Sequence, residues 1–411
     1  MSTVALISCA KSKKAAASAA GSLYTSSLFR KSLLYALTTS DAQYILSAKH
    51  GLLRLDEVIE PYEQTLKSMS KATKSAWGNL VIEKLKAALG KSDSILILAG
   101  ADYQGPVISA LRSSGHRIID PLQNLSLGQR LRRLRELNSE QELEGCYQEF
   151  YKLMNKLFVA QGGGRVLSES TGQLLWPRRG IYFFLEPTER SAEWSVGKMG
   201  FRVTRIGTHA VSKNSKTTLW DRLSTHRGNL YGGGSHRSSI FRLHVGSALA
   251  KRNPELAKTS WAAGSVAPAN VRKSEETLER NVSAYLGATR VLWLDVPDDP
   301  GPTSDRAYLE RNSIGTLSRY CILHPMISAS WLGTYSRNQK IALSGLWNLD
   351  HLFRKPHRCF IDILAVYIDA ALGRNAAPMR AIAPKEWYAA SGRTDSGQLS
   401  LFSNDSIKVT D

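Results

Sequence analysis

Three residues with the chemistry of phosphodiester cleavage are spread over the C-terminal two-thirds of the chain. They are Tyr182, Arg222 and Glu310. A carboxylate supplies the oxygen ligand that a hard divalent cation prefers, and a guanidinium offers a planar fork of donors for a phosphate. A phenol takes the proton of an attacking water only where neighbouring cations favour the phenolate. Together the three types predict metal-assisted hydrolysis of a phosphodiester bond.

Five short segments of the sequence would position these residues. Apolar runs bounded by glycine or polar residues are typical of strands, and segments with a threonine cap or helical spacing are typical of helices. Arg222 and His226 are four residues apart on the first predicted helix, so they share one of its faces. The predicted order is strand, strand, helix, strand, helix, over residues 180–184, 203–209, 217–227, 290–296 and 305–312.

This order of elements resembles the GIY-YIG nuclease family, with a Gly-Ile-Tyr motif that ends at Tyr182. In that family a glutamate holds one divalent metal, the tyrosine activates the attacking water, and an arginine stabilises charge on the phosphate. The resemblance implies the tyrosine role for Tyr182, the arginine role for Arg222 and the metal role, with Mg²⁺ or Mn²⁺, for Glu310. It also implies that His209 or His226 lies beside the scissile phosphate, in an α/β domain with a small central antiparallel sheet.

The second motif departs from the family pattern, because Arg205 stands where the second tyrosine is expected. Arg205 could add to the positive field around the phenol, or its presence could mean that the catalytic machinery is incomplete and the domain only binds DNA. Glu279 competes with Glu310 for the acidic role. Glu310 is preferred because the family places the metal ligand after the third strand, and Glu279 is expected on an exposed helix face.

A glycine-rich, basic insertion lies between the first predicted helix and the third strand. Glycine-rich loops with cations can wrap a phosphate backbone, although the insertion could equally be a flexible surface loop. The candidate nucleic-acid contacts in it are Arg227, His236, Arg237 and Arg242. Further on, segments around Trp331 and Trp347 are predicted to be buried turns that complete the core.

The first 120 residues alternate apolar runs with helical segments, which predicts a separate α/β layer domain. The predicted strands cover residues 4–8, 44–47 and 95–99, and the predicted helices 28–37 and 80–89. Polar residues follow the strands, where open α/β sheets build their sites. The candidate pocket residues are Cys9, Lys11, Lys49, His50 and Asp102.

This N-terminal pattern resembles the YaaA-like proteins, through small residues after a strand, a Gly-Leu-Leu segment and a Pro-Tyr pair. The resemblance implies a nucleic-acid-associated domain with a base-sized pocket that recognises, alters or excises a base. Two other interpretations stay open. Cys9 could be a small buried thiol, and the whole domain could serve only to position the nuclease.

Residues 122–160 are expected to be helical and carry a basic cluster, and three glycines, 162–164, then break the pattern. The predicted domains are therefore 1–160 and 165–370. Residues 371–411 form a C-terminal extension whose end is expected to be flexible.

The chain of 411 residues carries a formal net charge of +19, with 54 Lys and Arg against 35 Asp and Glu. Such an excess favours polyanionic partners, and we expect DNA. We expect no membrane association, because no run of eighteen apolar residues occurs. The first residues are typical of a buried strand rather than a signal peptide, and four scattered cysteines argue against a disulfide framework or a zinc site, so a cytoplasmic location is expected.

Together these patterns predict a metal-dependent DNA endonuclease of the restriction or defence type that acts on modified DNA. One alternative is a base-modifying protein of a 7-deazaguanine-type pathway, in which the second domain is a DNA clamp. Another is a DNA-binding protein without catalytic activity.

Overall fold

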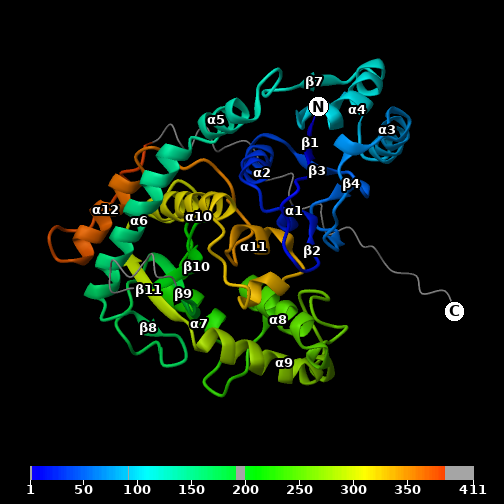
Figure 1. Cartoon of the computed structure of the whole chain (residues 1–411). Coiled ribbons are helices and arrows are strands. Elements are labelled where there is room, and N and C mark those ends of the chain that lie inside the picture. Colours follow the sequence, from blue (N-terminus) through cyan, green and yellow to red (C-terminus); the bar gives the residue numbers. More distant parts are fainter. Residues whose placement is uncertain (1, 91, 191–199, 385–411) are drawn as a thin grey trace.

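The computed structural model describes residues 2–90, 92–190 and 200–384. It contains two α/β units, each built on its own sheet (Figure 1). The predicted tail beyond residue 384 lies outside the described residues. No helix in the described ranges is both long and apolar enough to cross a membrane.

The N-terminal sheet has five strands in the order β4-β3-β1-β6-β7. Strands β1, β3, β6 and β7 run parallel, and β4 pairs antiparallel with β3. The predicted strands are confirmed, whereas β4 and β7 were not predicted. The bounds are β1 Thr3–Ser8, β3 Ala42–Ser47, β4 Gly51–Arg54, β6 Ser94–Leu98 and β7 Arg117–Ile119.

Helices cover both faces of this sheet, which explains why its strands are continuously apolar. Alternate residues of β1 enter opposite cores: Ala5 and Ile7 pack with helix α2, and Val4 and Leu6 pack with helix α3. Helix α3 begins nine residues before the predicted segment. The helices are α1 Ala20–Leu23, α2 Ser27–Thr39, α3 Lys71–Lys86, α4 Ala101–Ser113 and α5 Leu127–Leu137; beside them lie the short strands β2 Ser18–Ala19 and β5 Val58–Ile59 and the 3-10 turn η1 Leu66–Ser68.

The second sheet is small and antiparallel, as predicted, and its strand order is β10-β9-β11-β8. Strand β9 lies between β10 and β11 and is buried on both faces. Its Ile181 and Phe183 face one hydrophobic core, and its Tyr182 and Phe184 face another. The bounds are β8 Arg165–Val166, β9 Gly180–Arg190, β10 Phe201–Thr208 and β11 Arg290–Asp295.

Six helices enclose this second sheet within the described residues. Helices α6, α10 and α12 contribute to the core around Phe183, whereas α7, α8 and α9 contribute to the core around Tyr182. The helices are α6 Glu140–Ala160, α7 Leu219–Arg227, α8 Ile240–Arg252, α9 Ala269–Gly287, α10 Asp305–Leu323 and α12 Phe360–Ala371; α11 Gln339–Ser344 and the 3-10 turns η3 His236–Ser238, η4 Pro254–Leu256 and η5 Leu332–Tyr335 lie between them.

The segment predicted as helical before the three glycines forms two helices, α5 and α6. The break falls at Ser139, whose backbone has a left-handed φ of 51°, so a continuous helix cannot pass through it. Helix α6 packs on the second sheet, through Phe150 and Leu157. The three glycines that follow α6 also have positive φ, which explains the predicted break. The domain boundary at these glycines stays a prediction.

Helix α10 lies between the two sheets (Figure 1). Its last turn reaches the N-terminal core, where Ile322 packs together with Leu343 and Phe353 among residues of α2 and β1. Arg319 of α10 donates to the Asn138 carbonyl at 2.8 Å. The helix that carries Glu310 is therefore packed against both units.

A buried carboxylate ties the two predicted tryptophan turns to the sheet. Trp331 and Trp347 are fully buried, as predicted. Their indole N–H groups donate to Glu186 of β9 at 3.1 Å and 2.6 Å, and the Tyr285 hydroxyl donates to the same carboxylate. Burial raises the pKa of Glu186 above its usual range, and the three donors oppose that shift. The tryptophans thus serve packing and carboxylate stabilisation.

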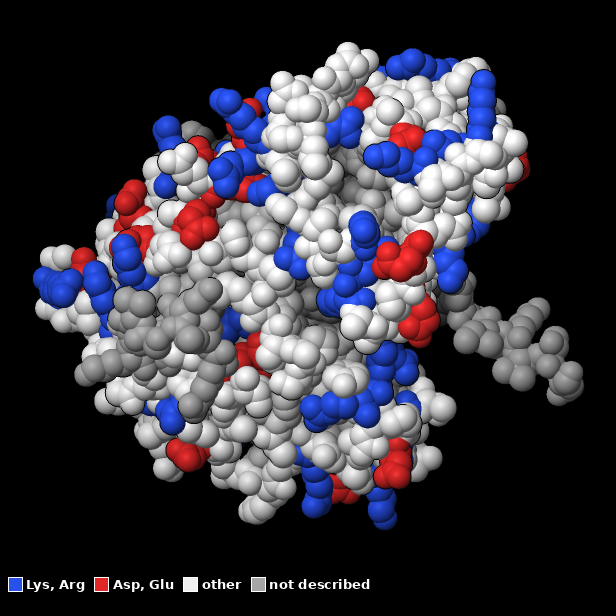
Figure 2. All heavy atoms as spheres, viewed as in Figure 1, with Lys and Arg blue, Asp and Glu red and all other residues white. Residues whose placement is uncertain are grey.

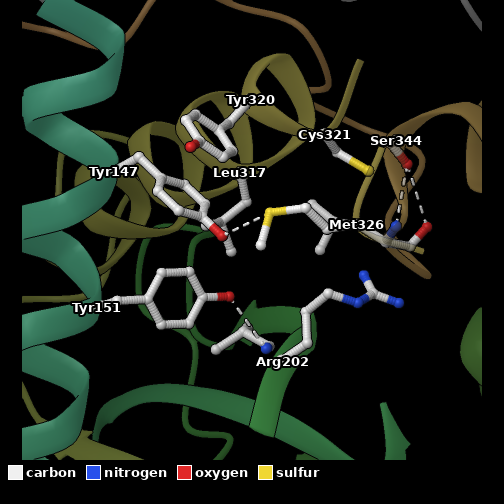
Figure 3. Close-up of a pocket in the computed structure, with 10 residues that line it drawn as sticks. Tyr147, Tyr151, Arg202, Leu317, Tyr320, Cys321, Met326 and Ser344 are labelled. Carbon is white, nitrogen blue, oxygen red and sulfur yellow. Dashed lines mark hydrogen bonds between the residues drawn. The ribbon is translucent and has the colours of Figure 1, made fainter. Parts of the chain in front are cut away.

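A cavity of about 20 Å³ lies between α6, β10 and α10 (Figure 3). The rings of Tyr147 and Tyr320 stack with centroids 3.5 Å apart, and the Tyr147 hydroxyl donates to the Met326 sulfur at 3.2 Å. Tyr151 and Arg202 close the remaining sides. Such a volume holds about one water molecule, so this cavity is a packing feature.

A fully buried ion pair, Arg306–Asp298, fixes the loop that leads into α10. Asp298→Ala should leave the Arg306 guanidinium buried without its partner and lower the free energy of unfolding by about 3–5 kcal/mol. Glu276→Ala, which breaks the exposed Arg280–Glu276 pair, should cost less than about 1 kcal/mol. Urea denaturation followed by circular dichroism measures both changes. Equal losses in the two variants would contradict the stabilising role of the buried pair.

Candidate active site

The Tyr182 side chain crosses strand β10 directly above Gly207. The two residues are register partners in the β9–β10 pair. A Cβ atom at position 207 would overlap the Tyr182 ring and its hydroxyl, so only glycine fits beneath the phenol. Gly180, the first residue of the motif, is restricted in the same way by the Leu294 carbonyl of β11. Gly207 therefore lets the Tyr182 ring lie across β10, and Gly180 lets β9 approach β11 closely.

His226 of α7 holds the phenol from the other side. Its Nε2 lies 2.9 Å from the Tyr182 hydroxyl, and its Nδ1 lies 2.8 Å from the Ser239 hydroxyl. Burial lowers the pKa of His226 well below its usual value, and Arg205, Arg222 and Arg242 lower it further. The imidazole is therefore neutral at physiological pH, and its Nε2 lone pair can accept the phenol proton.

Arg205, the residue that replaces the second motif tyrosine, lies within the same group. Burial lowers the pKa of Arg205, and the nearby Tyr182 hydroxyl and Glu310 carboxyl group oppose this shift. Its Nη1 donates to the Trp347 carbonyl at 2.8 Å, and its Nε has no partner among the described residues. The substitution thus places a cation beside the phenol.

Glu310 reaches this group from helix α10, at the open edge of β10. Its carboxylate accepts from the Thr208 backbone N–H and lies near Arg205 and Arg222. Burial raises the pKa of Glu310 to about 7, although these cations and the N–H favour the charged form. Arg222 is half-buried and makes no hydrogen bond or ion pair within the described ranges. The structure brings together Tyr182, Arg205, Arg222, His226 and Glu310.

This donor set fits a weakly held divalent cation. Glu310 is the carboxylate of the group, and no three acidic, histidine or cysteine side chains cluster as metal ligands in the described part of the chain. Mg²⁺ and Mn²⁺ accept such sites, because water and substrate phosphate oxygens supply their remaining ligands. A closed structural site with three protein ligands is excluded for the described residues.

His209 lies apart from the group. Its Nε2 is 3.1 Å from the Arg178 carbonyl, and its charge interactions are with Arg306, Asp221 and Arg179. Burial lowers the pKa of His209 to about 4, so it is neutral. Of the two histidines considered beside the phosphate, the structure places His226 with the phenol.

Most cations of the predicted glycine-rich loop are engaged internally. Arg242 is fully buried and donates to Glu279 at 2.5 Å, and His236 lies 2.9 Å from the same carboxylate. Arg237 forms two hydrogen bonds with Glu275, at 2.6 and 2.9 Å. These side chains fix η3 and α8 onto α9, and the predicted exposed position of Glu279 is wrong because α9 buries that face.

Arg227 differs from the other three, since its guanidinium is half-buried and contacts backbone carbonyls and the Trp220 ring. On the face shown in Figure 2, Lys and Arg side chains are spread widely, with Asp and Glu interspersed. The net positive charge is therefore not gathered into one patch on this face.

The N-terminal candidate residues cluster in part. Cys9, at the carboxyl end of β1, lies 3.2 Å from the Tyr103 hydroxyl, which follows β6. His50 packs edge-on against Tyr62, with ring centroids 5.4 Å apart, and its Nε2 is buried without a partner in the described residues. Lys49 Nζ lies 6.0 Å from the Tyr62 ring centroid. These groups gather at the carboxyl edge of the parallel sheet.

Two predicted residues lie outside this cluster, and several members were not predicted. Lys11 is exposed, and Asp102 pairs with Lys74 at 2.7 Å. Tyr24, Ser47 and Tyr62 form a buried chain of hydroxyls, with oxygen distances of 2.9 and 2.7 Å. The Pro-Tyr pair contained this signal, since a tyrosine among buried strands needs a hydrogen-bond partner.

The close packing of the phenol over Gly207 can be tested by adding one methyl group at position 207. Gly207→Ala should displace the Tyr182 ring from His226 and reduce DNA cleavage at least tenfold, while overpacking costs about 1–3 kcal/mol of stability. Gly145→Ala, in α6, has open space around its new Cβ and should leave cleavage unchanged. Cleavage rates at matched folded fractions measure the effect, and full activity in Gly207→Ala would refute the packing argument.

Comparisons with known proteins agree with this geometry. Residues 141–373, more than half of the chain, match the model of the GIY-YIG domain family. Residues 4–136 match a family of unknown function (DUF6884), so the YaaA-like resemblance stays a prediction. Searches of the curated proteins and of the solved structures each found no match. The chain belongs to the GIY-YIG domain family.

Proposed function

We propose that the chain is a metal-dependent DNA endonuclease whose active group is Tyr182, Arg205, Arg222, His226 and Glu310. Membership of the GIY-YIG family indicates phosphodiesterase chemistry. The observation that carries the proposal is the hydrogen bond between the phenol and a neutral, buried imidazole, surrounded by cations and next to one carboxylate.

Proton transfer would run from water through the phenol to the imidazole. Tyr182 passes its proton to His226 Nε2 and takes the proton of the attacking water. The water oxygen then forms its bond to phosphorus while the bond to the leaving oxygen breaks. Ser239 fixes the imidazole orientation through Nδ1, so Nε2 stays directed at the phenol.

The cations of the site would stabilise the charge that develops on the phosphate. Arg222 has its donors available for a phosphate, and Arg205 is held in a fixed orientation by the Trp347 carbonyl. Glu310 would hold Mg²⁺ or Mn²⁺, which supplies Lewis-acid polarisation of the phosphate oxygens when bound. The proximity of these side chains to one another supports the assigned roles.

For the N-terminal unit we propose recognition of a base, which would direct cleavage to modified DNA in restriction or defence. The Cys9 thiol, the Tyr103 hydroxyl and the unpartnered His50 Nε2 support this role, because they place partly buried hydrogen-bonding groups at the sheet edge where α/β domains build their sites. The same cluster supports the alternative in which this unit chemically alters the base.

The nuclease proposal predicts nicking of supercoiled plasmid with Mg²⁺ or Mn²⁺ and none after chelation. Tyr182→Phe and Glu310→Gln should each reduce the single-turnover rate by about 10²-fold or more. Tyr231→Phe and Glu255→Gln remove the same groups at exposed positions and should cleave like the original chain. Undiminished nicking by both active-group variants would overturn the assigned roles.

The proposal for the N-terminal unit predicts that modified and unmodified DNA of the same sequence are cleaved at different rates. Phage DNA with modified bases should be cut faster than unmodified DNA, and His50→Ala should remove the preference without abolishing nicking. Lys71→Ala, an exposed change in the same unit, should retain it. Mass spectrometry of the nucleosides discriminates the alternative, since an altered base with an intact backbone would favour base modification.

A further inference from the structure

Three half-buried tryptophans from separate elements pack together beside the active group. Trp176 precedes β9, Trp220 lies in the first turn of α7, and Trp293 lies in β11. The rings of Trp176 and Trp220 stack with centroids 5.5 Å apart and planes inclined by 22°, and Trp176 meets Trp293 edge-on at 5.0 Å.

Two guanidiniums are inserted into this stack. Arg165 of β8 lies 4.5 Å from the Trp176 centroid and 4.3 Å from that of Trp293. Arg227 of α7 lies 5.1 Å from the Trp220 centroid. The result is a continuous Arg–Trp ladder, which we define as Arg227, Trp220, Trp176, Arg165 and Trp293.

Backbone carbonyls fix both guanidiniums in place. Arg165 Nη1 donates to the Leu175 carbonyl at 2.9 Å, and Arg227 donates to the carbonyls of Gly228 and Ser170. The loop between them is itself held, because the Trp176 indole donates to the Thr171 carbonyl at 2.9 Å. These bonds use only part of the five N–H donors of each guanidinium.

Neither guanidinium of the ladder has an acidic partner in the part of the chain that the structure describes. Burial lowers the pKa of Arg165 and of Arg227, and no carboxylate opposes that shift in either case. Arg237, by contrast, has the pKa of its guanidinium raised by Glu275. An arginine held by aromatic rings and carbonyls, with donors left over, is pre-organised for an external anion.

The ladder adjoins the proposed cleavage site through Trp293. This residue is the β11 register partner of Tyr182, so the two side chains lie on the same face of adjacent strands. An anion on the ladder would therefore lie next to the group that acts on the scissile phosphate.

We propose that the Arg–Trp ladder binds the phosphates of the DNA backbone that flank the scissile phosphate, an inference that rests on the proposed nuclease function. Backbone rather than base is indicated, because the ring faces already contact one another or a guanidinium and the available groups are N–H donors. The contact is therefore independent of sequence and contributes to DNA affinity through counterion release.

Binding of a fluorescent duplex without metal, measured at several NaCl concentrations, tests the ladder. Arg165→Ala should weaken binding about tenfold at low salt and reduce the slope of log affinity against log salt by about 1. Trp176→Ala should weaken binding severalfold although it removes no charge, and Arg165→Lys should recover only part of the loss.

Arg117→Ala is the matched control, since it removes an exposed arginine on the edge strand of the N-terminal sheet and should change affinity less than twofold. Circular dichroism confirms that each variant is folded. The proposed role of the ladder would be overturned if folded Trp176→Ala bound DNA with native affinity. Equal losses of affinity in Arg165→Ala and Arg117→Ala would also overturn it.

The single-turnover cleavage rate at saturating DNA separates this inference from the proposed function. Arg165→Ala should need about tenfold more DNA to reach this rate, because the ladder acts in binding, whereas Arg117→Ala should need no more than the original chain. If the original chain binds DNA but cleaves none under any metal, the nuclease proposal fails and the binding results still decide the ladder. If it cleaves while the ladder variants bind normally, only the ladder fails.

Discussion

The Tyr182 phenol and the His226 imidazole share a hydrogen bond in a place where three guanidiniums make protonation of the imidazole unfavourable. A neutral imidazole is required, because a charged one would donate to the phenol instead of accepting from it. Burial supplies this condition, and the glycine beneath the ring makes the burial possible. The motif glycine beneath the phenol and the serine at the second ring nitrogen both support this one bond.

The carboxylates of the second unit divide its arginines into two classes. Buried acids engage the arginines that hold the fold together, which are Arg202, Arg237, Arg242 and Arg306. The remaining half-exposed arginines around α7 and β8 have rings or carbonyls as neighbours, with no ion pair among the described residues. An arginine paired with a buried acid stabilises the packing of the fold. An arginine held by aromatic rings, without an acid, keeps donors available for an anion. The net charge alone could not reveal this division.

The sequence predicted the five elements of the nuclease unit, because short apolar strands and helix caps are local signals. The grouping of Tyr182, Arg222 and Glu310 was implied by the family resemblance and by no local pattern. It misjudged the glycine-rich insertion, where α8 begins and Arg242 turns inward to Glu279. Pairing between residues 37 positions apart is a tertiary property that no local pattern encodes. The Arg–Trp ladder escaped prediction for the same reason, since its members come from three elements and a loop.

The central claim is tested most directly by locating bound Mn²⁺ in a crystal structure with DNA. Crystals grown with Mn²⁺ and a phosphorothioate duplex that resists cleavage would give an anomalous signal for the metal. The account predicts a peak about 2.1 Å from a Glu310 carboxylate oxygen, with a phosphate oxygen as a second ligand and the Tyr182 hydroxyl facing the phosphorus. A metal bound elsewhere, with the scissile phosphate remote from Tyr182, would contradict it.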